Sequence, residues 1–214
     1  MLPAEAAEEF LAFCRGNPRP LPLMAVGRPG DPRLPACGPE IDLRQDLGGY
    51  QVWQDGHLVA EPPDLLAHWQ PDDVAFVLGC WFSQEAALAA AGIRMRHLEL
   101  GIQGGLFRTD LATRPAGRFH GPVVVSARPF ADADLHSVLR ITADLPLGHG
   151  APLHQGDPTG LGITDLAQPD FGEALPPLPG ETMLYWGCGL TATEALRMAG
   201  VSRYATHRLS LIHI

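Results

Sequence analysis

The stretch Phe76-Val-Leu-Gly-Cys-Trp-Phe-Ser-Gln-Glu-Ala-Ala-Leu-Ala-Ala-Ala91 decides the fold class. Residues 76–80 form an apolar run that ends at Gly79-Cys80, which is typical of a strand buried on both faces. Residues 86–91, which follow Ser83, are alanine and leucine and predict a helix. The stretch is therefore a strand-turn-helix unit, and it predicts an α/β protein.

A second unit of the same kind follows 108 residues later. Residues 183–186 predict a strand, Gly187-Cys188 a turn, and residues 192–199 a helix that Thr191 and Glu194 would cap. Six pairs are identical at this offset: Gly79/Gly187, Cys80/Cys188, Ala87/Ala195, Leu88/Leu196, Ala91/Ala199 and Gly92/Gly200. The match predicts a duplicated module with parallel central strands in one mixed sheet, and a chance match of common residues is the alternative.

The segment between the two units predicts a smaller lobe. Residues 122–126 predict a strand and residues 134–143 a helix, followed by loops rich in Gly and Pro. We therefore expect an inserted α+β subdomain at residues 111–180, and a discontinuous α/β core at residues 1–110 and 181–214. The core should begin with an amphipathic helix over residues 4–14 and contain a hairpin at Asp55-Gly56.

Composition excludes several classes of function. All 15 basic residues are Arg, against 24 acidic residues, and the net charge is −9. The absence of Lys excludes a Schiff base and a Walker A loop, and the acidic balance argues against nucleic acid as a partner. Residues 74–82 are the longest apolar run and are too short to cross a bilayer, and the acidic start does not resemble a signal peptide. We expect a cytoplasmic protein with no membrane partner.

Each Gly-Cys turn places a thiol ahead of a predicted helix N-terminus, where unpaired N–H groups attract anions. The four cysteines lack a CxxC pair and predict free thiols. Two such turns, with hydroxyls at Ser83 and Thr191, suit a ligand with two carboxylates, and each helix should lower the pKa of its thiol. The alternative is that Gly-Cys only packs tightly, because free cysteine is commonly buried.

The predicted insertion carries a second group of polar residues. This group comprises Arg118, His120, Arg128, His149, His154 and Asp157. Loops stiffened by Gly and Pro can aim side chains at a ligand, so we expect the group to lie beside the Gly-Cys turns at the mouth of one cleft. Metal binding by the two later histidines and the aspartate is an alternative, but their spacing fits no standard ligand pattern. We predict neither a metal nor a cofactor.

Several motifs resemble those of the D-glutamate cyclase family, whose members are also called hydro-lyases. In chain order they are Asp42-Leu-Arg44-Gln-Asp46, Gly79-Cys-Trp-Phe-Ser-Gln-Glu85, Arg96-His-Leu-Glu99, Ala116-Gly-Arg-Phe-His-Gly-Pro122, His149-Gly-Ala-Pro-Leu-His-Gln-Gly-Asp-Pro158, Gly162-Ile-Thr-Asp-Leu166, Pro169-Asp-Phe-Gly172 and Trp186-Gly-Cys-Gly-Leu-Thr191. The resemblance extends from about Ala4 to His207. It implies a two-part α/β fold and cyclisation of D-glutamate to 5-oxo-D-proline with loss of water.

The sequence also departs from the family pattern. Members usually continue further than this chain before its first helix and after His207, so the resemblance implies a chain shortened at both ends. Gly104-Gly-Leu-Phe107 stands where a Val-Pro-Met-Tyr-like stretch is common, and Ala127 where Met is common.

These observations together predict a cofactor-independent hydro-lyase acting on a small amino dicarboxylate. The candidate catalytic residues are His120 and His154 as acid and base, and Cys80 or Cys188 as a nucleophile that would form a thioester. The candidate substrate-binding residues are Arg118, Arg128, Ser83, Thr191, His149 and Asp157. Two alternatives stay open: an amino-acid racemase that uses both thiols, and a non-catalytic module that binds a small anion. The sequence leaves a homo-oligomer open.

Overall fold

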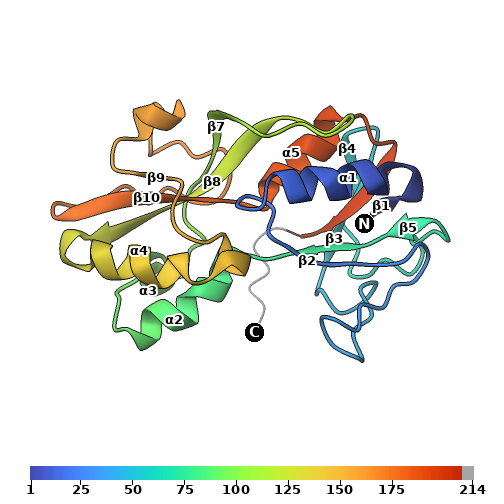
Figure 1. Ribbon diagram of the computed structural model, residues 1–214, viewed down its shortest axis with the longest axis horizontal. Coiled ribbons are helices and arrows are strands. Elements are labelled where there is room, and N and C mark those ends of the chain that lie inside the picture. Colours follow the sequence, from blue (N-terminus) through green and yellow to red (C-terminus); the bar gives the residue numbers. More distant parts are fainter. Residues whose placement is uncertain (209–214) are drawn as a thin grey trace.

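The computed structural model describes residues 1–208 as a mixed α/β protein (Figure 1). The α-helices are α1 (Ala4–Gly16), α2 (Glu85–Ala90), α3 (Arg96–Leu100), α4 (Leu135–Ala143) and α5 (Leu190–Met198). The strands are β1 (Leu2–Pro3), β2 (Leu23–Val26), β3 (Tyr50–Gln54), β4 (His57–Ala60), β5 (Asp73–Val74), β6 (Phe76–Leu78), β7 (Leu106–Ala112), β8 (Pro122–Ala131), β9 (His154–Gln155), β10 (Glu181–Gly187) and β11 (Arg203–His207). The predicted α/β class is confirmed.

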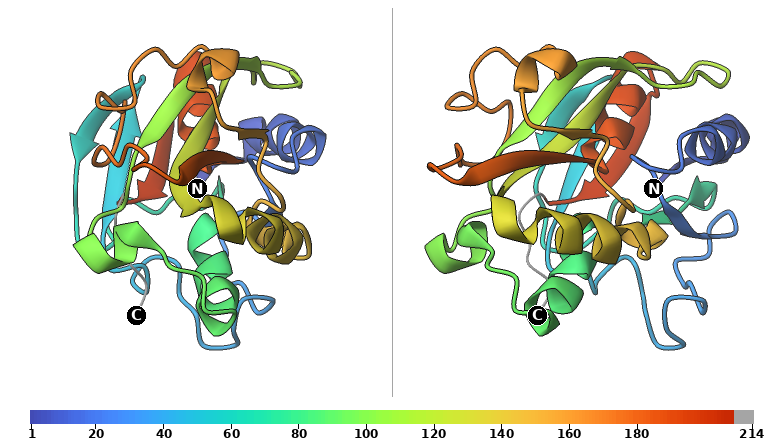
Figure 2. Two further views of the ribbon diagram at one scale, coloured as in Figure 1. Left: turned by 90° about the vertical axis from the view of Figure 1, so that its left-hand side faces the viewer. Right: turned by 60° about the vertical axis from the view of Figure 1, so that its left-hand side comes forward.

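The largest sheet has the strand order β7-β8-β10-β9. Side chains alternate between its two faces, because successive residues of a strand point in opposite directions. On one face, Phe130, Leu184 and Trp186 pack with Trp81 and with residues of α2 and α4. On the other face, Val125 and Tyr185 pack against the segment that follows β9. Figure 2 shows this sheet lying between α2 and α4 on one side and that segment on the other.

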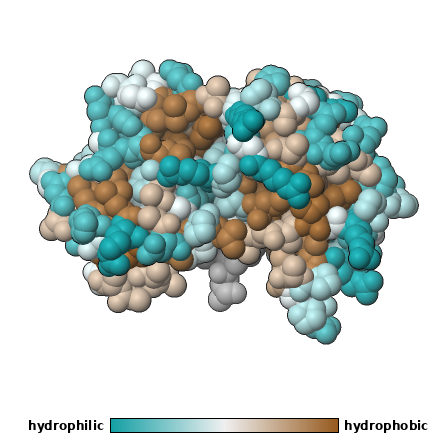
Figure 3. Space-filling view, viewed as in Figure 1, coloured by the Kyte–Doolittle hydropathy of each residue, from teal (hydrophilic) through white to brown (hydrophobic). Residues whose placement is uncertain are grey.

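A second core joins the N- and C-terminal parts of the described chain. Phe10 and Phe13 of α1 pack against Ala195 of α5 and Tyr204 of β11. Strand β11 is also the edge of a three-stranded sheet of order β11-β3-β4. The two cores form the left and right parts of Figure 1. Polar residues separate several apolar patches on the face of the molecule shown in Figure 3.

Local predictions from the sequence are confirmed at two places. The N-terminal amphipathic pattern forms α1, which begins at Ala4. The Asp55-Gly56 pair joins β3 to β4 in an antiparallel hairpin, with φ angles of +48° and +78°. Asp and Gly tolerate such angles, which explains why this dipeptide predicts the turn.

The prediction that the two strand-turn-helix units share one sheet with parallel central strands is wrong. Strand β6 pairs with β2, whereas β10 lies between β8 and β9. Within residues 1–208, the three pairings that these two strands make are all antiparallel. The short strand β6 finds its partner in the Pro-rich segment at the start of the chain. Each unit nevertheless has its strand, turn and helix, and a common origin by duplication stays a prediction.

The predicted inserted subdomain shares a sheet with the predicted core. Strand β8, from residues 111–180, pairs with β10 along seven residues from Glu181 to Gly187. The division into a core and an insertion therefore stays a prediction. Residues 209–214 lie outside the part of the chain that the structure describes. Within residues 1–208, the helices are too short or too polar to cross a membrane.

Candidate functional site

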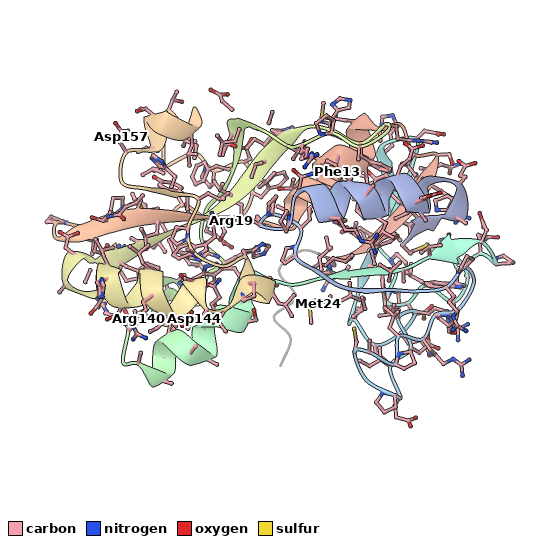
Figure 4. All side chains as sticks on the ribbon, viewed as in Figure 1. Phe13, Arg19, Met24, Arg140, Asp144 and Asp157 are labelled. Atoms are coloured by element: carbon pink, nitrogen blue, oxygen red, sulfur yellow. The ribbon has the colours of Figure 1, made fainter. Side chains whose placement is uncertain are left out.

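The two Gly-Cys turns meet the same loop, residues 18–22. The Gly79 N–H donates a hydrogen bond to the Pro22 carbonyl oxygen at 2.8 Å. At the other turn, a Cβ atom added to Gly187 would lie 2.7 Å from the Cα atom of Pro20. Figure 4 shows Arg19 of this loop near the middle of the molecule. Each turn needs glycine because another segment of backbone passes close to it.

Arg128 lies beside both turns and is almost completely buried. It stands opposite Leu184 in the β8–β10 pairing, and only 1% of its surface is exposed. Its guanidinium carbon is 5.0 Å from the centre of the Trp81 ring. One terminal nitrogen donates to the Ala127 carbonyl oxygen at 3.0 Å, whereas Nε has no hydrogen-bond partner within the described chain.

The guanidinium of Arg128 forms no ion pair with a carboxylate of residues 1–208. Burial lowers its pKa to about 10, while Cys188, Glu85 and Cys80 act in the opposite direction. Arg128 therefore stays charged at neutral pH. Burying a cation without a counter-ion is costly, so this arrangement suits the binding of an anion.

Both thiols at the turns are protonated at neutral pH. Cys80 is exposed and Cys188 is partly buried. Desolvation raises the pKa of Cys188 to about 12 and also raises the pKa of Cys80. The prediction that the helices lower these pKa values is wrong, because the stabilising backbone N–H groups are outweighed by the loss of water around the sulfur. At Cys80 the α-helix also begins only at Glu85.

Sequence reasoning missed a buried Glu-His pair next to Arg128. The Nε2 atom of His97 lies 2.9 Å from Oε1 of Glu85, and His97 is 2% exposed. Burial lowers the pKa of His97, so the ring is neutral at pH 7 and its Nε2–H donates to the carboxylate. Trp81 links this pair to the arginine, since its ring lies 5.2 Å from the His97 ring. Glu85 and His97 both occur in motifs that resemble those of the family, and this was the only sign in the sequence that they belong to a site.

We call Cys80, Trp81, Glu85, His97, Arg128 and Cys188 the Arg128 cluster. Several buried polar atoms in and around this cluster lack a partner within residues 1–208. They are Trp81 Nε1, Gln84 Oε1, Ser126 Oγ, Arg128 Nε and Trp186 Nε1. Buried polar atoms without partners are rare in proteins, and a group of them is typical of a place that binds water or a ligand.

Two predicted hydroxyl ligands have structural partners. The Ser83 hydroxyl donates to the Cys80 carbonyl oxygen at 2.7 Å and closes the turn. Thr191 is fully buried, and its hydroxyl accepts a hydrogen bond from the Val124 N–H at 2.9 Å. The predicted capping box is wrong, because Gly189 is the N-cap of α5 and Glu194 binds Arg108 instead.

His154 and Asp157 lie on the other face of the main sheet. His154 pairs with Tyr185, whose side chain points away from the face that carries Arg128. The His154 ring donates from Nε2 to the Asp157 carbonyl oxygen at 2.7 Å. The Asp157 carboxylate accepts hydrogen bonds from the N–H and hydroxyl of Thr159. These contacts build a local turn.

Arg118 and His120 are exposed in the connection between β7 and β8. The Arg118 N–H donates to the Glu9 carboxylate at 2.7 Å, which ties this connection to α1. Of the six polar residues in the predicted insertion group, Arg128 and His149 are the two that the structure brings to the Gly-Cys turns. Within residues 1–208, no group of three or more His, Cys, Asp or Glu side chains is arranged to hold a metal ion.

His149 is a buried part of the framework around the turns. Its backbone φ is +79°, and its Nδ1–H donates to the Arg19 carbonyl oxygen at 2.7 Å. The ring is 2% exposed, and burial lowers its pKa to about 4. His149 therefore holds residues 18–22 in place as a neutral donor.

Protonation of His149 should weaken the fold at low pH. The folded-state pKa is about 4, below the unfolded value of about 6.5, so the unfolded chain binds the proton first. The free energy of unfolding should keep the full contribution of this group above pH 6.5. It should fall by about 3 kcal/mol as the pH is lowered to 4. The variant His149→Asn keeps a donor and tolerates the positive φ. Its free energy of unfolding, measured with urea, should change less between pH 4 and 7 than that of the wild type. An unchanged dependence would contradict this role.

The sequence was compared with known proteins. Residues 74–213 match the family described as D-glutamate cyclase. A protein of Verminephrobacter eiseniae named "Putative hydro-lyase" is 48% identical over 207 residues, which are 97% of this chain and 76% of that protein. A protein of Bordetella petrii with the same type of name is also 48% identical, over 97% of this chain and 78% of the relative. This chain belongs to the D-glutamate cyclase family.

All six residues of the Arg128 cluster fall within the range that matches the D-glutamate cyclase family. The resemblance inferred from the sequence motifs is confirmed. The names of these relatives point to a lyase, and a family named for an acidic amino acid is consistent with a site built around an unpaired arginine.

Proposed function

We propose that this protein cyclises D-glutamate to 5-oxo-D-proline with release of water. The observation that carries the proposal is Arg128, a buried cation without a carboxylate partner in the described chain, which lies beside both Gly-Cys turns. A carboxylate of the substrate would supply the missing partner. The family to which the chain belongs and the names of its relatives support the same class of reaction.

The chemistry requires a neutral α-amine to attack the γ-carboxyl carbon. A C–N bond forms, and negative charge develops on the carboxyl oxygen in the tetrahedral intermediate. A C–O bond then breaks, and the oxygen leaves as water after it accepts protons. We assign the γ-carboxylate to Arg128, because a preorganised charged donor stabilises the developing oxyanion. The guanidinium is shielded from water, and the low local dielectric strengthens this electrostatic interaction.

Direct attack by the amine is favoured over the two routes that need a thiolate. Both a thioester intermediate and a two-thiol racemase depend on deprotonated cysteine. The raised pKa values of Cys80 and Cys188 leave both residues as thiols at neutral pH. As thiols, Cys80 and Cys188 could still donate a proton to the leaving oxygen.

The test follows D- and L-glutamate in D₂O by proton NMR. We expect D-glutamate to give 5-oxoproline with its α-proton retained, because cyclisation leaves that bond intact. Exchange of the α-proton would indicate a racemase, and thermal stabilisation by glutamate without turnover would indicate a binding module. The double variant Cys80→Ser/Cys188→Ser should retain turnover by direct attack, whereas a thioester route would be abolished.

A further inference from the structure

We infer that Glu85 receives the substrate's amine and that the site thereby selects amino dicarboxylates over dicarboxylates without an amine. The inference rests on the proposed function for the nature of the substrate.

The Glu85 carboxylate is fixed on one side and free on the other. Its Oε1 accepts the hydrogen bond from His97. Within residues 1–208, no side chain or backbone N–H donates a hydrogen bond to its Oε2. The Glu85 side chain is 20% exposed, whereas that of His97 is 2% exposed. A buried neutral histidine thus holds one oxygen of a carboxylate that still reaches solvent.

Glu85 lies close enough to Arg128 to act on its charge, and its carboxylate helps to keep the pKa of the guanidinium up. The centre of the Trp81 ring lies 5.0 Å from the Arg128 guanidinium carbon and 5.2 Å from the centre of the His97 ring, so one indole contacts both the cation and the Glu-His pair. A second indole, Trp186, packs on Trp81 at 5.5 Å and keeps it in place. A positive group and a negative group therefore lie around the same indole.

Such a pair of opposite charges fits a ligand that carries both a carboxylate and an amine close together. In cyclisation the amine must reach the γ-carboxyl carbon, so the residues that bind these two groups have to be neighbours. Glu85 would stabilise the ammonium form on binding and accept its proton before attack. A dicarboxylate without an amine would instead leave Glu85 facing no cation.

His97 acts through Glu85 and is a positioning residue. Because its ring is neutral, it donates one hydrogen bond and adds no positive charge that would compete with the substrate's ammonium group. His97→Gln retains a donor of similar reach and should keep part of the selectivity. His97→Leu removes the donor and should lose selectivity to the same extent as a change at Glu85.

A matched control is available at Glu173. This carboxylate also interacts electrostatically with Arg128, but it is exposed and accepts a hydrogen bond from the Gln103 N–H at 3.1 Å. Glu85→Gln and Glu173→Gln therefore remove the same charge near the same arginine. They differ in that only Glu85 is paired with His97.

The experiment compares D-glutamate with glutarate, which lacks the amine. Binding is measured by stopped-flow tryptophan fluorescence before turnover, with the folded state of each variant checked by circular dichroism. We expect the wild type to bind D-glutamate more tightly than glutarate. Glu85→Gln should weaken D-glutamate binding by on the order of tenfold or more and leave glutarate binding equal or tighter. Glu173→Gln should preserve the ratio of the two affinities.

The inference would be overturned if Glu85→Gln left the ratio of the two affinities unchanged or weakened the binding of both ligands equally. It would also be overturned if the wild type bound neither ligand. Failure of the proposed function is a separate result, because binding is measured without turnover. A protein that prefers D-glutamate through Glu85 but yields no 5-oxoproline would retain this inference and contradict the proposed reaction.

Discussion

Replacing Arg128 by methionine is expected to lower kcat/KM for D-glutamate by on the order of 10³-fold, because the variant loses the charged donor that stabilises the oxyanion. The same change should raise the melting temperature by several degrees, roughly 2–4 °C for each kcal/mol gained. Arg128 is 1% exposed and its Nε lacks a partner, so an apolar side chain of similar length removes an unpaired buried charge. Opposite changes in activity and stability distinguish a ligand-binding residue from a structural one.

Arg94→Met is the matched control for this prediction. Arg94 pairs with Glu99 at the surface at 2.6 Å, and its side chain is 64% exposed. Exposed ion pairs contribute little, so both activity and melting temperature should stay close to those of the wild type. Arg128→Lys keeps the charge without the guanidinium fork and should fall between wild type and Arg128→Met in kcat/KM. Full activity of Arg128→Met would contradict a substrate-binding role. The same conclusion would follow if Arg128→Met failed to fold while Arg128→Lys folded with wild-type activity.

The sequence predicted local structure well because local structure depends on neighbouring residues. The Asp55-Gly56 turn and helix α1 follow from the residues within them. Strand pairing depends on distant segments, and the apolar run at β6 did not reveal that its partner would be β2. Apolar runs of this length suit strands in parallel and antiparallel sheets alike, so the sheet arrangement was predicted wrongly.

The candidate site was predicted in part for a related reason. Arg128 was expected to bind a carboxylate, and its burial without a counter-ion favours that role. Polar residues in Gly/Pro loops were a weaker guide, since the Asp157 carboxylate bonds to Thr159 two residues later. Short polar side chains often satisfy nearby backbone N–H groups in this way. The Glu85–His97 contact was missed because it depends on how the chain turns between the two residues.

Replacing Gly79 by alanine is expected to reduce the free energy of unfolding by about 3 kcal/mol or more, which exceeds the usual cost of overpacking a core. An added Cβ would overlap the Leu147 carbonyl oxygen, and the hydrogen bond from the Gly79 N–H to Pro22 opposes movement of the turn. Because this turn lies beside Arg128, the variant should also lose turnover at temperatures where it remains folded. Urea unfolding and the NMR assay measure the two effects.

Gly189→Ala is the control, since its φ is −58° and no atom lies within 4 Å of an added Cβ. It should change stability by less than about 1 kcal/mol, because Ala suits this backbone conformation. Gly187→Ala, in contrast, should resemble Gly79→Ala, because its Cβ would lie 2.7 Å from the Pro20 Cα. Equal stability of all three variants would refute the close-approach argument. If both turn variants are strongly destabilised, separate packing requirements suffice to explain glycine at the two positions, and the Gly79/Gly187 identity alone does not argue for duplication.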